Sequence, residues 1–329
     1  MSHPIFEANE SSPYGDLSRE QFFNKHKILH QENFMLNKEK LKIYTQSWKP
    51  DPTTTPPPPP LRGVVAMIHG YKMESSWLFE LNAVAIAKAG FLVCALDIQG
   101  HGYSQGTPGH IPNLENIISD CIQFFDTIKV ENPTLPAFLY GESLGGAIAI
   151  LVCLKQRENN DDQYWKGMVL SGPMCGISRK FKPIWPLEKL LPLVASIAPS
   201  FRIVITKPLA RKSFKESWKG KLIGNSPNKL AYGKPTAATV LQFLRACDNI
   251  QKNCHLLRVP LLIVHGAEDR VCDPEAANSV FELVGSDDKT FKIFDGMWHQ
   301  LIGEPNEKYE LVFDTIMTWL QVKVKTLVV

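Results

Sequence analysis

Short, almost wholly apolar runs alternate with amphipathic segments over most of the chain. Strands buried on both faces have this continuous apolar character, whereas half-buried strands alternate polar and apolar positions. The pattern predicts strands at residues 63–68, 91–97, 136–140, 167–170, 260–264 and 290–294. It predicts helices at residues 77–89, 114–129, 144–156, 236–249, 274–284 and 308–323.

The regular order of these elements predicts the fold class. Parallel strands are joined by right-handed helical crossovers, so helices cover both faces of the resulting sheet. We therefore expect an α/β protein with a mostly parallel, doubly wound sheet. Residues 41–48 alternate with period two, and with residues 33–36 they predict an N-terminal antiparallel hairpin. A short helix is expected before it, at residues 19–26.

One long segment interrupts the alternation and suggests how the domains are arranged. Residues 172–235 are rich in proline, lysine and aromatic residues, and the helical pattern within them contains three prolines. We interpret this segment as an inserted helical cap. It separates a first part of the core, residues 33–171, from a second part, residues 236–329. Residues 1–32 are interpreted as a polar N-terminal extension.

Composition and charge exclude several classes of protein. Of the 329 residues, 44% are hydrophobic and 21% are charged, which excludes disordered, collagen-like and coiled-coil chains. The 36 basic and 33 acidic residues form no basic block, so we expect no nucleic-acid partner. No apolar run reaches the ~18 residues of a membrane span, and the N-terminus has no signal-peptide pattern. Seven scattered cysteines without a CxxC pair favour reduced thiols in the cytoplasm.

The strongest chemical signal is Gly141-Glu142-Ser143-Leu144-Gly145, which fits the pattern G-x-S-x-G. It follows a predicted strand directly and opens a predicted helix, as a nucleophile elbow must. The turn is tight, so Gly141 and Gly145 are needed for their lack of a β-carbon. We expect Ser143 to project at the carboxyl end of the sheet. The alternative is a glycine-rich helix start with a capping serine.

Serine is a weak nucleophile at neutral pH and needs a base, which in turn needs an acid to orient it. In this arrangement the chain order is Ser, then Asp or Glu, then His. One C-terminal strand runs into an acidic loop containing Asp269, and the next runs into a loop containing His299. We assign His299 as the base of Ser143 and Asp269 as the orienting acid. Asp273 and Glu268 are the rival acids.

A His-Gly pair at residues 69–70 ends another predicted strand. Glycine allows a backbone to approach the substrate closely, so this turn suits an oxyanion hole. We expect the backbone N–H groups of Tyr71 and Leu144 to be its donors. A plain strand-to-helix turn is the alternative. His101 is expected to shape a loop below the site, and His265 to be a structural residue.

Together these motifs resemble the α/β-hydrolases of the monoacylglycerol lipase group. The glutamate before the serine resembles the plant branch, which includes caffeoylshikimate esterase, whereas animal and bacterial members usually carry histidine there. The chain departs from many plant relatives at Thr236, where they carry arginine. The resemblance covers about residues 20–325 and rests on His69-Gly70, residues 97–102, residues 141–146, the Asp269 loop and residues 296–299.

The resemblance implies an α/β-hydrolase fold and a serine hydrolase acting on carboxylic esters, without metal or organic cofactor. By analogy Ser143, Asp269 and His299 form the triad, and Tyr71 and Leu144 supply the oxyanion hole. The substrate is then monoacylglycerol-like or a hydroxycinnamoyl ester. An esterase acting on a methyl-ester alkaloid, with subsequent decarboxylation, an acyltransferase and a non-catalytic ligand receptor are the alternatives.

The predicted cap, residues 172–235, bears on which ligand and which surface the protein contacts. The resemblance implies that it forms an acyl or aromatic pocket over the site. Its helical segment, residues 186–198, is apolar on much of its surface. That surface either packs inside the cap or makes weak peripheral contact with a membrane. We expect a small-molecule ester as the ligand and no obligate protein partner.

Overall fold

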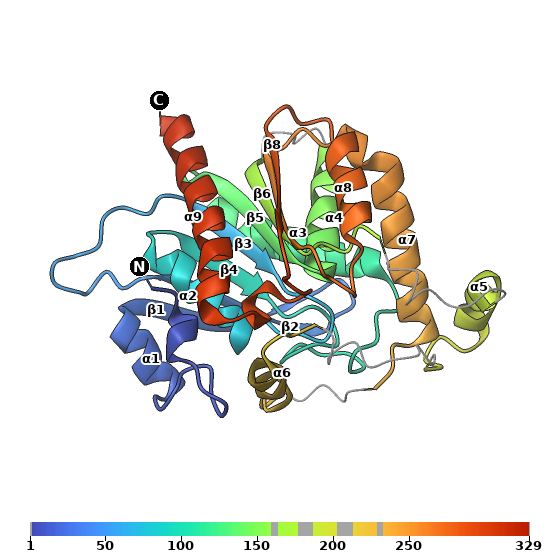
Figure 1. Ribbon diagram of the computed structural model, residues 1–329, viewed down its shortest axis with the longest axis horizontal. Helices are drawn as coiled ribbons and strands as arrows, with labels where there is room; N and C mark the ends of the chain where they lie inside the picture. Colours follow the sequence, from blue (N-terminus) through green and yellow to red (C-terminus); the bar gives the residue numbers. More distant parts are fainter. Residues whose placement is uncertain (1, 159–163, 177–186, 203–212, 229–232, 329) are drawn as a thin grey trace.

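The computed structural model describes the chain except for residues 1, 159–163, 177–186, 203–212, 229–232 and 329. Among the described residues, eight strands form one sheet with helices on both faces (Figure 1). The strands are β1 (Ile28–Leu36), β2 (Lys42–Pro50), β3 (Val64–Ile68), β4 (Leu92–Leu96), β5 (Ala137–Glu142), β6 (Trp165–Ser171), β7 (Leu261–Gly266) and β8 (Lys289–Phe294). Their order in the sheet is β1-β2-β4-β3-β5-β6-β7-β8.

The sheet is mostly parallel, as expected. Strand β2 is antiparallel to both of its neighbours, β1 and β4, and the remaining pairs are parallel. The α-helices are α1 (Arg19–His26), α2 (Leu78–Lys88), α3 (Leu114–Glu131), α4 (Leu144–Glu158), α5 (Leu187–Ile197), α6 (Ser217–Gly224), α7 (Ala237–Asn253), α8 (Pro274–Leu283) and α9 (Asn306–Val328). The 3-10 turns include η1 (Pro4–Glu7), η3 (Cys254–Leu256) and η4 (Leu301–Gly303). The predicted fold class is confirmed.

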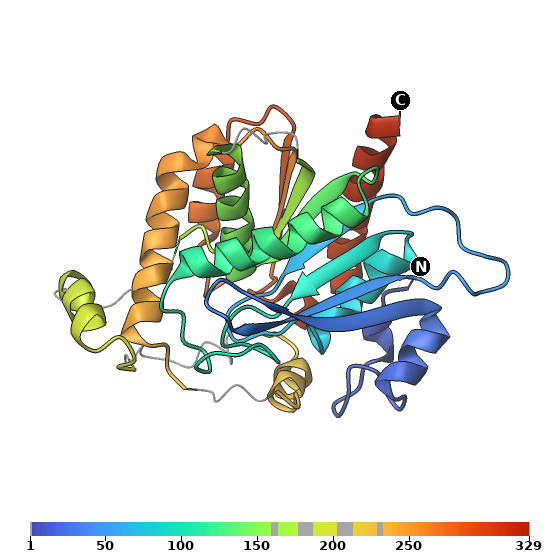
Figure 2. The same ribbon diagram turned by 180° about the vertical axis from the view of Figure 1, so that it is seen from behind.

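Strand β3 shows why the central strands are continuously apolar. Val64, Ala66 and Ile68 point into a core shared with α3, α4, α7 and α8. Val65 and Met67 point to the opposite face, into a core shared with α1, α2 and α9. Figures 1 and 2 show these two helical layers from opposite sides of the sheet. Because both faces are covered, each large aliphatic side chain contributes about 1.5–3 kcal/mol through burial.

The N-terminal region differs most from the sequence-based expectation. Strand β1 begins at Ile28, five residues before the predicted residue 33. The sequence pattern did not reveal these first residues, because most side chains of the strand are exposed and lack an apolar alternation. Its pairing with β2 comes from backbone hydrogen bonds. The segment before β1 is also closely packed, since Ile5, Tyr14 and Phe22 are buried in the core beside α2.

Two helices of the predicted cap segment lie within the described residues. Helix α5 packs on α7 through Leu191, which contacts Ala237 and Val240. Helix α6, which the pattern did not predict, buries Lys219 and Leu222. The described residues contain no helix long and apolar enough to cross a membrane. Other parts of the cap segment, including residues 177–186 and 203–212, lie outside the described chain.

Candidate active site

The turn between β5 and α4 has the geometry that the G-x-S-x-G motif predicts. Ser143 adopts φ +54°, a left-handed conformation that residues other than glycine rarely take. The flanking glycines have no room for a side chain. A Cβ on Gly141 would lie 2.7 Å from Gly146 Cα, and one on Gly145 would lie 2.8 Å from His69 O. The tight backbone therefore holds Ser143 in a strained conformation at the carboxyl end of β5.

Ser143, His299 and Asp269 form one hydrogen-bonded chain. Ser143 Oγ lies 2.9 Å from His299 Nε2, and His299 Nδ1 lies 2.6 Å from Asp269 Oδ2. An ionised carboxylate can only accept, so it places the proton on Nδ1 and leaves Nε2 able to accept from the serine. Asp269 Oδ1 is held by the backbone N–H groups of Val271 and Cys272, at 2.7 and 3.0 Å.

The rival residues occupy other places. Asp273 caps the N-terminus of α8, where its side chain accepts from the backbone N–H of Glu275. Glu268 is exposed. His265 is buried, its Nδ1 donates to Gly266 O at 3.1 Å, and burial lowers its pKa. Neither rival carboxylate therefore takes the position beside His299 that Asp269 occupies.

The two histidines near the β3 and β4 ends are also buried. His69 Nε2 accepts from the backbone N–H of Ile98 at 3.0 Å. His101 Nδ1 donates to Gln99 O at 3.0 Å. Burial lowers the pKa of His69 to about 4 and that of His101 to about 3, so both are neutral at pH 7. Their contacts fit loop-shaping roles.

The β3–α2 turn runs directly beside the serine. A Cβ on Gly70 would lie 3.2 Å from Ser143 Cβ, so no larger residue fits there without displacement. Tyr71 follows this glycine, and Leu144 begins α4 on the other side of the serine. In the described part of the chain neither of their backbone N–H groups has a hydrogen-bond acceptor. Both groups are thus available to an oxygen bound at Ser143.

Glu142, the residue before Ser143, fixes the elbow through side-chain hydrogen bonds that the sequence did not predict. Its Oε1 accepts from Tyr140 Oη at 2.6 Å and from Asn82 Nδ2 at 3.0 Å. Asn82 Oδ1 in turn accepts from Tyr309 Oη of α9 at 2.7 Å. Burial raises the pKa of Glu142 to about 7, although these hydrogen bonds and His299 oppose the shift. The motif position was visible in the sequence, but its partners were not.

The loop carrying His299 is held by residues distant in the sequence. Lys219 of α6 is fully buried, and its Nζ donates to Ile302 O at 2.9 Å and to Glu304 O at 2.5 Å. Burial lowers the pKa of this ammonium to about 8. Glu304 Oε1 accepts from the backbone N–H of Trp298 at 2.6 Å. No motif in the sequence indicates this bracing.

Cys272 is a further neighbour that the pattern did not single out. Its Sγ lies 3.9 Å from Ser143 Oγ, and burial raises the pKa of the thiol. It therefore stays protonated and contributes a weak polar contact. No group of three or more His, Cys, Asp or Glu side chains in the described residues could hold a metal ion.

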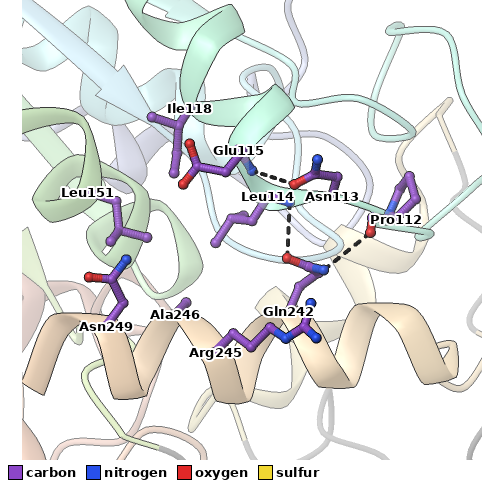
Figure 3. A pocket seen from close by; sticks show the side chains of 10 residues that line it. All are labelled: Pro112, Asn113, Leu114, Glu115, Ile118, Leu151, Gln242, Arg245, Ala246 and Asn249. Carbon is purple, nitrogen blue, oxygen red and sulfur yellow. Dashed lines mark hydrogen bonds between the residues drawn. The ribbon is translucent and has the colours of Figure 1, made fainter. Parts of the chain in front are cut away.

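A cavity of about 390 Å³ lies apart from these residues, between α3, α4 and α7 (Figure 3). Gln242 spans one side of it, accepting from the backbone N–H of Leu114 and donating to Pro112 O, both at 3.2 Å. None of Ser143, Asp269 and His299 lines it. Its polar contacts fasten α7 to the start of α3. The lining residues are Pro112, Asn113, Leu114, Glu115, Ile118, Leu151, Gln242, Arg245, Ala246 and Asn249.

Known proteins are similar to this chain in sequence and in fold. The family described as serine aminopeptidase, S33 (Hydrolase_4) matches residues 59–306, about three quarters of the chain. Caffeoylshikimate esterase of Arabidopsis thaliana is 29% identical over 315 residues, covering 95% of this chain and 91% of that protein. Monoglyceride lipase of Homo sapiens is 29% identical over 297 residues, covering 89% of this chain and 91% of that protein.

Solved structures agree in fold. A soluble variant of monoglyceride lipase from Saccharomyces cerevisiae superposes with a TM-score of 0.75 at 20% identity, covering 88% of this chain and 94% of that one. The monoacylglycerol lipase of Paleococcus ferrophilus gives a TM-score of 0.69 at 24% identity, covering 85% and 99%. The chain belongs to the serine aminopeptidase S33 (Hydrolase_4) family, has the α/β-hydrolase fold, and is a serine ester hydrolase.

Proposed function

We propose that Ser143 is the nucleophile and His299 its general base. Ser143 Oγ attacks the ester carbonyl carbon while His299 Nε2 takes the hydroxyl proton. Asp269 holds the imidazole tautomer and stabilises the imidazolium that forms. The carbonyl oxygen becomes an oxyanion bound by the N–H groups of Tyr71 and Leu144, which are worth roughly 3–4 kcal/mol each in comparable sites. The hydrogen-bonded chain from serine to carboxylate carries this proposal.

The second half of the cycle uses the same groups. His299 gives its proton to the departing alcohol, and the C–O bond to that alcohol breaks, leaving an acyl group on Ser143. Water then attacks the acyl carbon while His299 takes one of its protons. The acid leaves and the proton returns to Ser143 Oγ. Glu142 is a positioning residue, because its carboxylate bonds the side chains of Tyr140 and Asn82 rather than the reacting atoms.

We propose a monoacylglycerol-like or hydroxycinnamoyl ester as the substrate. The two proteins named above, caffeoylshikimate esterase and monoglyceride lipase, support these two classes equally, at 29% identity each. A methyl ester of a specialised metabolite is the further alternative. A cytoplasmic location suits the seven cysteines, which are all buried and form no disulfide bond with one another.

A side-by-side assay tests this proposal. Purified protein is given a monoacylglycerol in one well and caffeoylshikimate in the other, with the Ser143→Ala variant as blank. We expect one of the two to be hydrolysed by the wild-type protein and neither by the variant. Hydrolysis by the variant at the wild-type rate would overturn the role of Ser143. Wild-type labelling by a fluorophosphonate without hydrolysis of either ester would reject both substrate classes and leave the metabolite ester.

We also propose that α5 makes peripheral contact with membranes. Leu193, Ile197 and Phe201 are 58%, 76% and 61% exposed, so this side of the helix and the residues after it present apolar surface to solvent. Sedimentation with phosphatidylcholine vesicles tests the contact. We expect the wild-type protein to pellet with vesicles more than a Leu193→Gln, Ile197→Gln double variant. Equal pelleting of the two would contradict the contact.

A further inference from the structure

Residues 213–228 of the predicted cap, here called the α6 segment, are joined to the loop that carries His299. Lys219 Nζ donates to two carbonyl groups of that loop, at 2.9 and 2.5 Å. The backbone N–H of Glu216 donates to Gly303 O of the same loop at 2.9 Å. Side-chain and backbone contacts therefore both fasten the α6 segment to the region that positions the proposed base.

The α6 segment is also joined to a second loop, the one between β3 and α2. Both carboxylate oxygens of Glu74 take part, because Oε1 accepts from Ser226 Oγ and Oε2 accepts from Asn228 Nδ2 at 2.7 Å. Trp77 adds another contact, since its Nε1 donates to Leu222 O at 2.7 Å. One short segment is thus hydrogen-bonded to two loops that are more than 200 residues apart in the chain.

Glu74 is a buried anchor rather than a surface contact. Its exposed fraction is only 8%, and burial raises its pKa, although the hydrogen bonds from Asn228 and Ser226 oppose the shift. A buried carboxylate that loses its donors is costly, so both of these bonds stabilise the present arrangement. The next residue is bound to the core instead, since the backbone N–H and Oγ of Ser75 donate to Asp97 Oδ1 at 2.6 and 2.7 Å.

The loop that Glu74 anchors contains a proposed oxyanion-hole donor. A Cβ on Gly70 would lie 3.2 Å from Ser143 Cβ, so the loop begins beside the nucleophile. The backbone N–H of Met73 donates to Gly70 O at 3.1 Å and closes a tight turn around Tyr71. Glu74 follows this turn directly. The direction of the Tyr71 N–H therefore depends on a turn whose far end is tied to the α6 segment.

We propose that the α6 segment acts as a brace between the oxyanion hole and the base, and that Glu74 is the positioning residue that ties it to the oxyanion-hole loop. This inference rests on the proposed roles of Tyr71 and His299. The transition state needs the N–H at the oxyanion and the imidazole at the proton at the same time. A displacement of either group by about 1 Å is enough to slow the reaction strongly.

Glu74→Gln tests the anchor, because the amide keeps the size of the side chain but offers one acceptor oxygen instead of two. We expect kcat to fall about tenfold with KM nearly unchanged, since the oxyanion contact forms only in the transition state. The rate is divided by the number of active sites, counted by fluorophosphonate titration of Ser143, so a loss of folded protein does not affect it. Glu282→Gln, at an exposed position of α8, is the matched control. An unchanged kcat in Glu74→Gln would overturn the proposal.

A Ser226→Ala, Asn228→Ala double variant removes the same contact from the other side. Asn228 is half-buried, so this variant keeps the test valid if Glu74→Gln fails to fold. We expect a similar fall in kcat, and little further loss when all three substitutions are combined, because one contact can be lost only once. Losses that multiply to about a hundredfold would contradict a role of Glu74 through the α6 segment. Ser217→Ala, at an exposed serine of α6, should leave kcat unchanged.

The proposal stays testable if neither proposed ester is hydrolysed. The rate of fluorophosphonate labelling of Ser143 then replaces kcat, since the phosphoryl oxygen of the reagent occupies the same oxyanion hole. We expect Glu74→Gln to slow labelling about tenfold. Equal labelling rates in the variant and the wild type would reject the brace, whereas the absence of hydrolysis alone rejects only the proposed substrate classes.

Discussion

The loop that carries Ser143 and the loop that carries His299 are held in place in different ways. The serine turn is fixed locally, by glycines that pack against backbone within a few residues and against the neighbouring strand β3. The histidine loop is fixed over long range. Lys219 donates to two of its carbonyls, and the backbone N–H of Gln300 donates to Ser213 O at 2.8 Å.

The two loops should therefore respond differently to substitutions. Backbone packing leaves the serine turn one conformation, so a single added methyl group displaces the whole turn. The histidine loop depends on separate polar contacts, each of which can be removed while the others remain. A single substitution should therefore cause a large loss of stability and activity in the serine turn, whereas substitutions in the histidine loop should cause smaller, separate losses.

The largest expected effect follows from Gly145→Ala. The new Cβ would lie 2.8 Å from His69 O and closer still to Ile68 O, and backbone cannot move aside as a flexible side chain can. We expect a loss of about 3 kcal/mol in unfolding free energy and a fall of about 10²-fold in kcat, measured by denaturant unfolding and ester hydrolysis.

Gly220→Ala is the matched control for this prediction. Its Cβ would make only ordinary contact, 3.5 Å from Phe214 Cβ, within helix α6. Replacing a helical glycine by alanine should stabilise the protein by about 0.5–1 kcal/mol. If Gly145→Ala behaves like Gly220→Ala, the turn is not fixed by backbone packing.

The next effect comes from Lys219→Met, which keeps the shape of the side chain but removes its donors. The carbonyls of Ile302 and Glu304 would lose their buried partner. We expect unfolding free energy to fall by about 2 kcal/mol and kcat by about tenfold, because the loop that positions His299 loosens. The control is Lys221→Met, an exposed position on the same helix, which should change stability by less than about 0.5 kcal/mol. Equal behaviour of the two variants would refute the bracing role.

Glu142→Gln tests, through its pH dependence, the polar contacts that Glu142 makes beside the serine turn. Burial raises the pKa of Glu142 to about 7 in the folded protein, from 4.5. The folded state therefore holds this proton more tightly than the unfolded state does. The protonated carboxyl group contributes its full share of the unfolding free energy below about pH 4.5, and this contribution is lost as the pH rises toward 7. The amide does not titrate. We expect the stability of the variant relative to wild type to rise by about 2 kcal/mol between pH 4.5 and 7.5, measured by urea unfolding.

The comparison of two pH values within each protein is the internal control for that prediction. Other titrating groups, such as Asp97, are present in both proteins and cancel in the difference. Stability curves of wild type and variant that run parallel over this range would mean that Glu142 titrates alike in the folded and unfolded chain.

The smallest effect is expected from Glu304→Gln. The amide oxygen can still accept from the backbone N–H of Trp298, and burial already raises the pKa of this carboxyl group. We expect a loss of less than about 1 kcal/mol in thermal or denaturant unfolding, against about 2 kcal/mol for Glu304→Ala, which removes the acceptor. Similar losses in both variants would show that the charge, rather than the acceptor, holds the loop.

The sequence predicted the parts of the molecule that depend on local pattern. Strand β3 and helix α4 were predictable because burial on both faces and the G-x-S-x-G spacing leave clear signals within ten residues. The edge strand β1 was predicted five residues short, since an exposed edge has no apolar alternation to detect. Helix α6 was missed because its short sequence, with two glycines, has little intrinsic helix propensity.

The candidate site divides in the same way. Ser143, Asp269 and His299 were named from motif and chain order, and the structure places them in hydrogen-bonding contact. The contacts of Lys219 and Glu74 could not be predicted, because each joins segments tens of residues apart and depends on tertiary packing. A buried lysine and an exposed one look identical in sequence.

The nucleophilic role of Ser143 is tested most directly by peptide mass spectrometry after brief exposure to a fluorophosphonate. We expect one adduct, on the peptide containing Ser143, and a labelling rate at least 10²-fold lower in His299→Ala, because the serine then lacks its base. An adduct on another residue, such as the neighbouring Cys272, or an undiminished rate in His299→Ala, would contradict the assignment.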